Sequence, residues 1–474
     1  MKEVHIDSMS LDRLARLLDP DRAELLRSRA ETARRLLAGR TVWNVNATAS
    51  GGGVAEMLTT LLAYSRGAEV DARWLVLEGT PEFFKLTKRL HNLLHGSAGD
   101  GGDVGDAERE VYESVLADNA AALREWVKAG DIVLLHDPQT AGLVDGLQGI
   151  GATVIWRCHI GKDDDDELTE RGWAFLKPYL KACDGVIFSR AAYVPGWVDQ
   201  DTLRLIPPSL DPFSAKNVGL REVDVHSALH HAGLVDIPNH RGSLTFERRD
   251  GTEGTVRQHE GLFAAGEVIP GDARLVMQVS RWDRLKDMTG VLRSFVDHLD
   301  AFPDDVHLAL VGPEVSGVSD DPEGAEVLEE CVALWREQPA EAQRRVHLVA
   351  LPMDDVDENA HLVNALQHHA TVVVQKSLVE GFGLTVTEPM WKGKPVVASR
   401  VGGIQDQIVD GVSGLLLDDP EDLDAFAELL VRVLEDPELA ARLGEQARER
   451  VREMFLGDRH LIQYVQLFAE LLEL

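Results

Sequence analysis

Two series of short apolar segments, with helical stretches between the segments, constrain the fold of this chain most strongly. The first series comprises residues 42–45, 73–77, 132–135, 154–157, 185–188 and 203–206. The second comprises residues 275–279, 306–311, 346–350, 371–374, 395–398 and 414–417. Continuously apolar strands that alternate with helices predict parallel sheets covered on both faces. We therefore expect an α/β chain with two doubly wound parallel-sheet domains.

A proline-rich segment, 207–212, separates the two series and predicts a linker, because proline restricts its own backbone and that of the preceding residue. Leucines at helical spacing predict helices over residues 8–40, and the polar region 213–268 predicts helix and irregular connections. The expected parts are an N-terminal helical extension (1–40), a first domain (41–212) rejoined by a C-terminal helix (457–474), and a second domain (213–456). Ligands of such sheets bind at the carboxyl ends of the strands, so we expect the domains to face an interdomain cleft.

The composition argues against several classes of function. A formal net charge of −32 over 474 residues argues against nucleic acid and anionic membranes as partners, because both require clustered Lys and Arg. Three cysteines without C-x-x-C spacing, and an N-terminus without an export signal, predict a cytoplasmic protein. No apolar run approaches the length of a membrane span. The acidic surface leaves a homodimer open, with the N-terminal helices as one candidate contact.

The most informative motif lies between residues 376 and 403. Glu380 precedes the glycine-flanked turn Gly381–Gly383, and an expected helix beginning near Leu384 carries a second carboxylate, Glu388. The first backbone amides of a helix have no partner within the helix, so they favour a phosphate or sugar oxygen. The two carboxylates could then accept hydrogen bonds from sugar hydroxyls. This arrangement predicts a site for a sugar nucleotide.

Other segments that could take part in binding or catalysis follow predicted strands in both halves. Arg281 and Lys286 stand where the first strand of the second half gives way to a helix, which suits a diphosphate. The alternative is a solvated loop in which Asp283 and Asp287 pair with these cations. The glycine run 51–53 before a helix is either an anion-binding loop or a plain turn, and it matches neither a dinucleotide fingerprint nor a Walker loop.

In the first half, the segments 136–139 (H-D-P-Q) and 156–160 (W-R-C-H-I) end neighbouring predicted strands. Asp137 and Gln139 could bind acceptor hydroxyls, and His159 could bind a sugar hydroxyl or serve a structural role. The acidic run 163–166 suggests a metal, but acids favour the start of a helix, and we expect one at 167–182. We therefore predict no metal site.

The chain resembles retaining glycosyltransferases of the GT-B fold. The matching segments of the second half are E-G-F-G-L-T-V-T-E (380–388), S-R-W-D-R-L-K (280–286), K-P-V-V-A-S-R-V-G-G-I (394–404) and D-G-V-S-G-L-L (410–416). Segments 44–58, 83–96, 136–139, 156–160 and 207–217 resemble the family of trehalose glycosyltransferring synthase and retaining trehalose phosphorylase. The closer resemblance spans about residues 41–455 and implies two Rossmann-like domains.

The resemblance implies a role for each matching residue. The catalytic group would comprise Arg281 and Lys286 on the donor diphosphate, Glu380 on the transferred glucose, and His159 near its reacting face. The donor-binding group would comprise Gly52, Gly53, Gly381, Phe382, Gly383, Leu384 and Glu388, with Glu388 on the ribose. The acceptor-binding group would comprise Asn46, Asp137, Gln139 and Arg157. The acidic segment 161–166 departs from the family pattern on the expected acceptor side.

The implied reaction is the reversible, retaining transfer of glucose from a nucleoside diphosphate glucose to free glucose, which forms α,α-trehalose. The expected partners are therefore a nucleotide sugar, such as ADP-glucose or UDP-glucose, and glucose or trehalose. No cofactor is required in this scheme, because Arg and Lys would stabilise the leaving group. The alternatives are a trehalose phosphorylase that uses glucose 1-phosphate, a nucleotide-sugar epimerase of the same fold, and a non-catalytic sensor.

Overall fold

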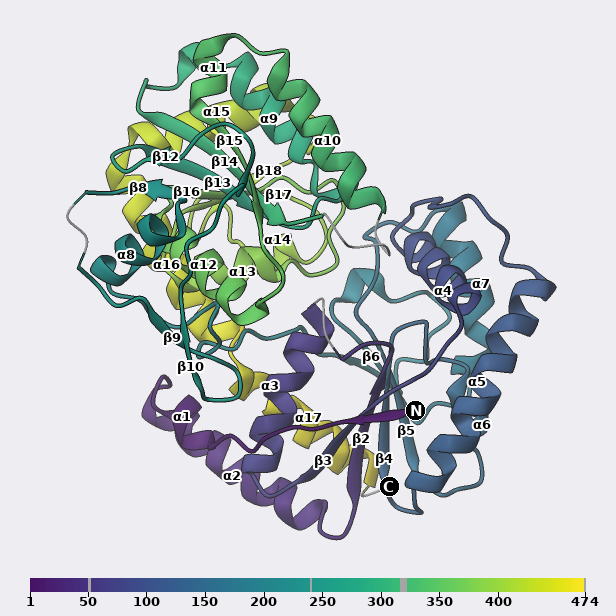
Figure 1. Cartoon of the computed structure of the whole chain (residues 1–474). Helices are drawn as coiled ribbons and strands as arrows, with labels where there is room; N and C mark the ends of the chain where they lie inside the picture. The colour runs from purple at the N-terminus through teal and green to yellow at the C-terminus, as the bar shows by residue number, and fades with distance from the viewer. Residues whose placement is uncertain (50–52, 239–240, 316–321, 473–474) are drawn as a thin grey trace. The chain divides into compact units, whose positions relative to one another are not determined.

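The computed structural model describes residues 1–49, 53–238, 241–315 and 322–472, and the chain divides into two compact units (Figure 1). Unit 1 comprises Met1–Leu210 and Phe455–Leu474, and unit 2 comprises Asp211–Met454. Each unit is built around a seven-stranded, mostly parallel sheet, which confirms the predicted fold class. Within the described part of the chain, no helix combines the length and the apolar character needed to cross a membrane.

The sheet of unit 1 has the strand order β1-β3-β2-β4-β5-β6-β7. The strands are β1 (Lys2–Val4), β2 (Thr41–Asn46), β3 (Asp71–Val76), β4 (Ile132–His136), β5 (Thr153–Cys158), β6 (Gly185–Phe188) and β7 (Leu203–Leu205). Strands β2 to β7 pair in parallel and correspond to the predicted segments. The sequence did not predict β1, which pairs antiparallel with β3 and has no buried residue to mark it as a strand.

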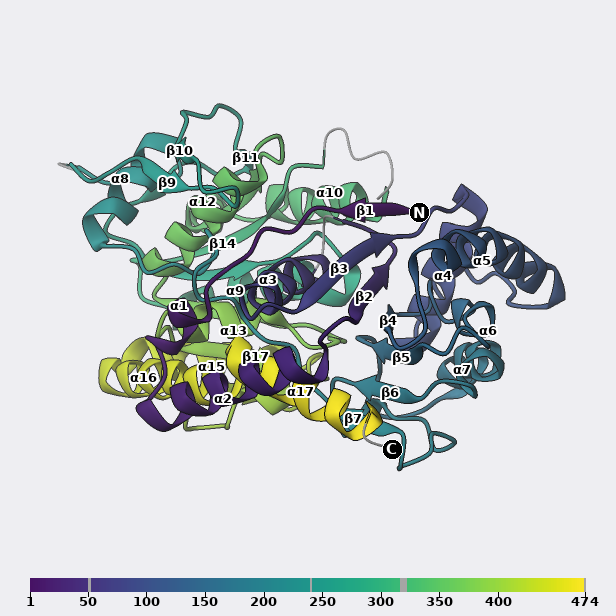
Figure 2. The same ribbon diagram turned by 90° about the horizontal axis from the view of Figure 1, so that it is seen from below.

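Two layers of helices cover this sheet, because neighbouring residues of each strand point to opposite faces. On one face, Val133 and Leu135 of β4 pack against α4 (Pro81–Leu94), α5 (Asp106–Trp126), α6 (Leu143–Gly146) and α7 (Glu167–Leu180). On the other, Ile132 and Leu134 pack against α2 (Pro20–Leu36), α3 (Gly53–Gly67) and α17 (Gly457–Leu472). Figures 1 and 2 show both layers.

The predicted N-terminal helices form part of unit 1. Ser10 caps α1 (Leu11–Ala15), and Asp19 caps α2, which has Pro20 at its first position, where proline loses no helical hydrogen bond. Arg22 of α2 forms a 2.7 Å ion pair with the buried carboxylate of Asp458 in α17. This pair ties the N-terminal helices to the C-terminal helix of the same unit.

The sheet of unit 2 has the strand order β11-β15-β14-β13-β16-β17-β18. The strands are β11 (Phe263–Ala265), β13 (Arg274–Val279), β14 (Val306–Pro313), β15 (Val346–Leu351), β16 (Val372–Gln375), β17 (Val396–Ser399) and β18 (Leu415–Leu417). The six parallel strands correspond to the second predicted series. The antiparallel edge strand β11 lies in the region predicted as irregular.

Helices also cover both faces of the second sheet. One core joins the sheet to α9 (Met288–Asp297), α10 (Pro322–Arg336), α15 (Leu423–Glu435) and α16 (Pro437–Met454), and the other joins it to α8 (Glu222–Ala232) and α12 (Val356–His369). The remaining helices are α11 (Ala340–Arg345), α13 (Leu384–Trp391) and α14 (Ile404–Gln407). The region 213–268 also contains the antiparallel pair β9 (Thr245–Glu247) and β10 (Glu253–Thr255), and β8 (Val235–Asp236), which pairs with β12 (Ile269–Pro270). The sequence did not predict these strands, because their two or three residues show no apolar pattern.

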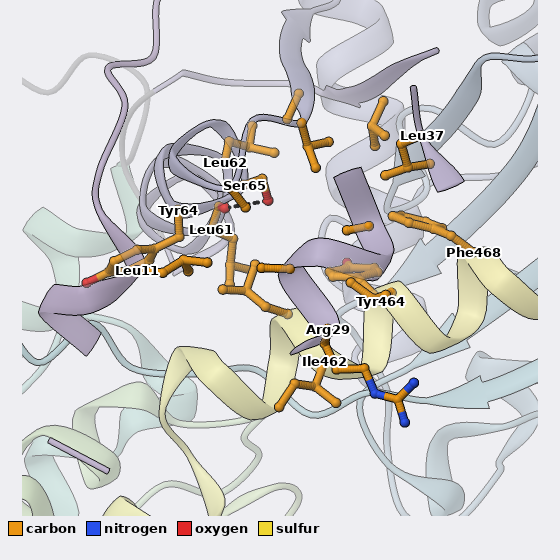
Figure 3. A pocket seen from close by; sticks show the side chains of 18 of the residues that line it. Leu11, Arg29, Leu37, Leu61, Leu62, Tyr64, Ser65, Ile462, Tyr464 and Phe468 are labelled. Carbon is orange, nitrogen blue, oxygen red and sulfur yellow. Dashed lines mark hydrogen bonds between the residues drawn. The ribbon is translucent and has the colours of Figure 1, made fainter. Parts of the chain in front are cut away.

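An apolar cavity of about 60 Å³ lies among α2, α3 and α17 in unit 1. Figure 3 shows Leu61 and Leu62 of α3 and Phe468 of α17 around it. Ala30 and Ala33 of α2 also line the cavity, and Ala33 is the buried one of these two small residues. Atoms that line a void lose the contacts a filled core would provide, so the packing here is incomplete.

We predict that Ala33→Leu raises the free energy of unfolding by about 1 kcal/mol, because leucine fills the cavity and keeps helical propensity. Urea unfolding followed by tryptophan fluorescence measures the change. The matched control is Ala228→Leu, since Ala228 is fully buried in the core of unit 2. Overpacking should lower stability there by about 1–3 kcal/mol. A destabilised Ala33→Leu variant would contradict the prediction.

Candidate functional site

The order of strands reverses once in each sheet, and the predicted site residues cluster where it does. In unit 1 the chain passes from β2 to β3 on one side and returns as β4 on the other; in unit 2 the same reversal separates β13 from β16. Crossover connections diverge at such a point and leave the carboxyl ends of the two strands open to a ligand. Candidate residues follow β4 and β5 in unit 1, and β13 and β16 in unit 2.

In unit 2 the structure brings Lys286 and Glu380 together. Lys286 ends a short 3₁₀ turn after β13, and its Nζ lies 2.6 Å from Oε2 of Glu380, which follows β16. Oγ of Ser377 donates to the same carboxylate oxygen at 3.3 Å. Both charged side chains are largely buried, so the attraction between them is screened less than on the surface. A lysine ammonium has three N–H donors, so Lys286 can hold Glu380 and still donate to an anion.

A layer of polar groups beneath this pair fixes the strand ends. The side chain of Gln278 accepts a hydrogen bond from the backbone amide of Lys376 at 3.0 Å and donates to the carbonyl of Lys286 at 2.7 Å. The Lys376 ammonium, fully buried, pairs with the carboxylate of Asp287, which also caps α9 through the amide of Gly290. Asp287 therefore pairs with Lys376, whereas the alternative sequence interpretation paired it with Arg281 or Lys286.

The glycine-flanked turn leads into helix α13, as the sequence predicts. Gly383 has φ +87°, a conformation that only glycine adopts readily, and α13 begins at Leu384. The Gln407 side chain donates to the carbonyls of Phe382 and Gly383 at 2.5 and 3.1 Å. The Phe382 side chain is buried, so this residue can offer a ligand its backbone but little of its ring.

Arg281 is the most exposed member of the predicted catalytic group. Its side chain is 60% exposed, and its nearest carboxylate is Asp283 at 3.3 Å. Asp283 also accepts the amide of Leu285 at 2.8 Å and so shapes the turn that carries Lys286. An exposed pair of this kind contributes little to stability, so Arg281 can leave it for a ligand at low cost.

Glu388 lies in α13 and is buried among partners that sequence reasoning missed. Its two carboxylate oxygens lie 3.3 Å from Nζ of Lys216 and 3.3 Å from Nε2 of Gln367. Lys392, one turn later, bonds to Asn217 and to the Glu388 carbonyl. Burial lowers the pKa of Lys392 to about 7, against the opposing effect of Glu388. The carboxylate of Glu388 is therefore held in one orientation by a cation and an amide.

In unit 1 the structure brings Asp137 and His159 together. Oδ1 of Asp137 accepts the backbone amide of His159 at 2.7 Å, and Asp137 adopts a left-handed conformation with φ +64°. Burial raises the pKa of Asp137 to about 7. His159 and Gln139 are half-buried beside it. His159 also contacts His136, whose Nδ1 lies 3.1 Å from its Nε2.

Two residues predicted to bind the acceptor have hydrogen-bond partners within unit 1. Arg157 is fully buried, and its guanidinium donates to His460 at 2.7 Å, to the hydroxyl of Tyr464 and to the carbonyl of Ile206 at 2.9 Å. These bonds join it to α17 and to the residue that follows β7, and its role in acceptor binding stays a prediction.

Asn46 is likewise buried: it accepts from the indole of Trp74 and donates to the carbonyl of Thr48, both at 2.8 Å. These bonds stabilise the turn after β2 and leave the amide poorly placed for a sugar. In the glycine run, Gly53 begins α3 and is exposed, whereas Gly52 lies outside the described residues.

The acidic run serves the start of α7, as predicted. Asp166 caps this helix and accepts the amides of Leu168 and Thr169, both at 2.9 Å. Asp163 forms a 2.6 Å ion pair with Arg190. These contacts account for the two acids without a ligand.

Several residues of both clusters were missed for different reasons. Gln278 and His136 are polar residues within or at the end of buried strands, and that pattern alone marks them as worth attention. Lys216 is different, because its partner Glu388 is remote in sequence and no local pattern connects them. Sequence reasoning had no means to pair these two residues.

Comparisons with known proteins show the family of this chain. Residues 44–195 match the family model "Trehalose synthase, N-terminal domain", and residues 263–450 match "Glycosyl transferases group 1". The trehalose synthase of Rubrobacter xylanophilus is 36% identical over 454 residues, which cover 95% of each chain. The trehalose phosphorylase of Pleurotus pulmonarius is 26% identical over 432 residues, which cover 86% of this chain and 54% of that protein.

Among solved structures, an α,α-trehalose-phosphate synthase (UDP-forming) from Burkholderia vietnamiensis has a TM-score of 0.65 at 16% identity. The alignment covers 90% of this chain and 98% of that one. This likeness establishes the GT-B fold, and the sequence similarity over nearly the whole chain establishes the family. The chain therefore belongs to the trehalose synthase family and is a glycosyltransferase that acts in trehalose chemistry.

Proposed function

We propose that this protein transfers glucose from a nucleoside diphosphate glucose to the anomeric hydroxyl of free glucose and forms α,α-trehalose with retention of configuration. The observation that carries the proposal is the Lys286–Glu380 pair at the strand reversal of unit 2, at the start of α13. A cation for a diphosphate and a carboxylate for glucose hydroxyls stand there side by side. The 36% identity to a trehalose synthase over 95% of both chains supports the same reaction.

The donor is assigned to unit 2. Arg281 and Lys286 would neutralise the diphosphate, and Glu380 with the backbone of residues 381–384 would hold the glucose. Glu388 would accept hydrogen bonds from the ribose hydroxyls. Its contacts with Lys216 and Gln367 support this role, because a carboxylate fixed on one side presents its remaining lone pairs in one direction.

The acceptor is assigned to Asp137 and Gln139 of unit 1, with His159 near the reacting carbon. In the proposed step, the bond between C1 of the donor glucose and the phosphate oxygen breaks, and its electron pair stays with the diphosphate. The acceptor oxygen bonds to C1 on the same face, and its proton passes to the departing phosphate. Arg281 and Lys286 would take up the charge of the leaving group, so the proposed reaction uses neither a metal nor another cofactor.

One observation favours the synthase over the phosphorylase. The match to the trehalose synthase extends over 95% of that protein, whereas the match to the trehalose phosphorylase covers only 54% of its length. The buried, oriented carboxylate of Glu388 also suits a ribose, which glucose 1-phosphate lacks. A nucleotide-sugar epimerase would turn over its donor without any acceptor.

We predict that the protein forms trehalose from free glucose and at least one of ADP-glucose, UDP-glucose and GDP-glucose. The reaction is measured by digesting the product with a trehalose-specific hydrolase and quantifying the glucose that is released. Trehalose formed only from glucose 1-phosphate would establish the phosphorylase instead. Consumption of the donor without glucose would indicate an epimerase, and binding without turnover would indicate a sensor.

Replacement of Lys286 tests the diphosphate assignment. We predict that Lys286→Met lowers kcat/KM by about 10² to 10³, because charge that develops on the leaving group loses its nearest cation. The matched control is Arg284→Met on the same 3₁₀ turn, where Arg284 pairs with the exposed Glu326 and Glu330. An exposed pair contributes little, so this control should stay within about twofold of wild type. Equal losses in both variants would contradict the assignment.

Glu388→Gln tests the ribose assignment. We predict that this change weakens inhibition by a nucleoside diphosphate by about 10-fold to 100-fold, because hydrogen bonds from hydroxyls to a charged acceptor are lost. Inhibition by inorganic pyrophosphate, which has no ribose, should not change. Steady-state inhibition constants for both compounds, measured on wild type and variant, give the comparison. Parallel weakening of both would place Glu388 at the phosphates or in the scaffold.

A further inference from the structure

Three side chains of unit 1 form a hydrogen-bonded chain that ends at His159. Oδ1 of Asn44 lies 3.1 Å from Nε2 of His136, and Nδ1 of His136 lies 3.1 Å from Nε2 of His159. The two rings stack, with planes inclined by 15°. Asn44 on β2 and His136 on β4 are 4% and 1% exposed. The chain thus begins in the core at the strand reversal and ends at a half-buried residue.

The direction of donation along this chain follows from the chemistry of its members. An amide oxygen only accepts, so Nε2 of His136 carries a proton and donates to Asn44. Burial, with the charge of Arg157, lowers the pKa of His136 to about 3, so the ring is neutral and its Nδ1 is an acceptor. Nε2 of His159 must then be the donor in the second bond. Burial also keeps the pKa of His159 well below its usual value.

We propose that Asn44 and His136 are positioning residues that hold the imidazole of His159 in the Nε2–H tautomer, so that its Nδ1 offers a lone pair to a sugar hydroxyl. Among the described residues, none forms a hydrogen bond with this Nδ1. The benefit rests on the proposed function, since transfer of glucose builds positive charge at its anomeric carbon. A neutral ring with a lone pair tolerates that charge, whereas an imidazolium would repel it.

A second histidine pair, in unit 2, shows what a purely structural arrangement looks like. Nδ1 of His307 lies 2.9 Å from Nε2 of His347, and Nδ1 of His347 lies 2.8 Å from the carbonyl of Glu267. A carbonyl only accepts, so His347 carries its proton on Nδ1, which is the opposite tautomer. Both ring nitrogens of His347 have partners within the protein. The pair of His136 and His159 differs, because its series of hydrogen bonds leaves Nδ1 of His159 available to a ligand.

The tautomers can be measured by ¹⁵N–¹H correlation NMR on histidine-labelled full-length protein without ligands. The His159 signals are assigned by their loss in His159→Gln, and His347 serves as the internal reference for the opposite tautomer. We expect Nε2–H for His159 in wild type and a mixture of tautomers in His136→Leu. His136→Asn should restore Nε2–H, because its side-chain oxygen can take the place of Nδ1. Wild-type His159 in the Nδ1–H form would overturn the proposal.

Kinetics separate positioning from simple stability. We expect His136→Leu to lower kcat by about 10-fold to 100-fold with little change in KM for the donor, and His136→Asn to recover most of that loss. If His136→Leu does not fold, Asn44→Leu replaces it, since it removes the first acceptor of the same chain. Equal kcat in His136→Leu and His136→Asn, despite different tautomers, would overturn the proposed benefit.

Asn44 also lines the apolar cavity of unit 1, so Ala33→Leu is the control for changes in cavity packing. This variant should leave both the tautomer of His159 and kcat unchanged. A shift of tautomer in Ala33→Leu would mean that packing, and not the hydrogen-bonded chain, sets the ring state. The NMR result stands without any assay of activity, so it tests the chain of donation even if the protein makes no trehalose.

Discussion

The hydrogen bond between the Lys376 amide and the Gln278 side chain fixes the point on which the site of unit 2 depends. It joins the ends of β13 and β16, the two neighbouring strands at which the crossover connections diverge. The other end of the same Gln278 amide holds the carbonyl of Lys286 and so sets the height of its ammonium beside Glu380. The buried side-chain amide of Gln278 thereby helps to set the distance between the Lys286 ammonium and the Glu380 carboxylate, which lie on two different loops.

Three largely buried lysines of unit 2 are each held by a carboxylate, although the chain as a whole is strongly acidic. With a net charge of −32, an anionic ligand would meet repulsion over much of the surface. Within unit 2, Lys216, Lys286 and Lys376 each pair with a carboxylate, and all three are mostly buried. Burying a charge costs free energy unless the charge is paired. In each of these pairs the carboxylate therefore stabilises the buried ammonium group in place of water. The carboxylates gain a fixed orientation from the same contacts.

The sequence predicted the sheets well because each central strand is apolar on both faces. Such a strand is a continuous apolar run of residues, which is recognised directly in the sequence. It missed β1 and β11, which lie at sheet edges and have few buried residues to mark them. Lys286, Glu380 and Glu388 could be singled out from the sequence because the motifs that contain them are local. Arg157 lies near the end of an apolar strand, and the sequence could not show its partners His460 and Tyr464, which lie about 300 residues away. Contacts of that separation leave no local pattern.

The buried position of Arg157 bears on the chemistry of unit 1. Its guanidinium is sealed beneath α17 by His460, Tyr464 and a backbone carbonyl, so its charge stays in the core. That charge adds to burial in lowering the pKa of both His136 and His159. In the proposed reaction the sugar acceptor would be neutral and the carbon it attacks would become positive, so unit 1 would need neutral lone pairs where unit 2 would need cations. Burial, with the charge of Arg157, favours neutral histidines, because protonating either ring would cost solvation and would place like charges together in a medium that screens them poorly.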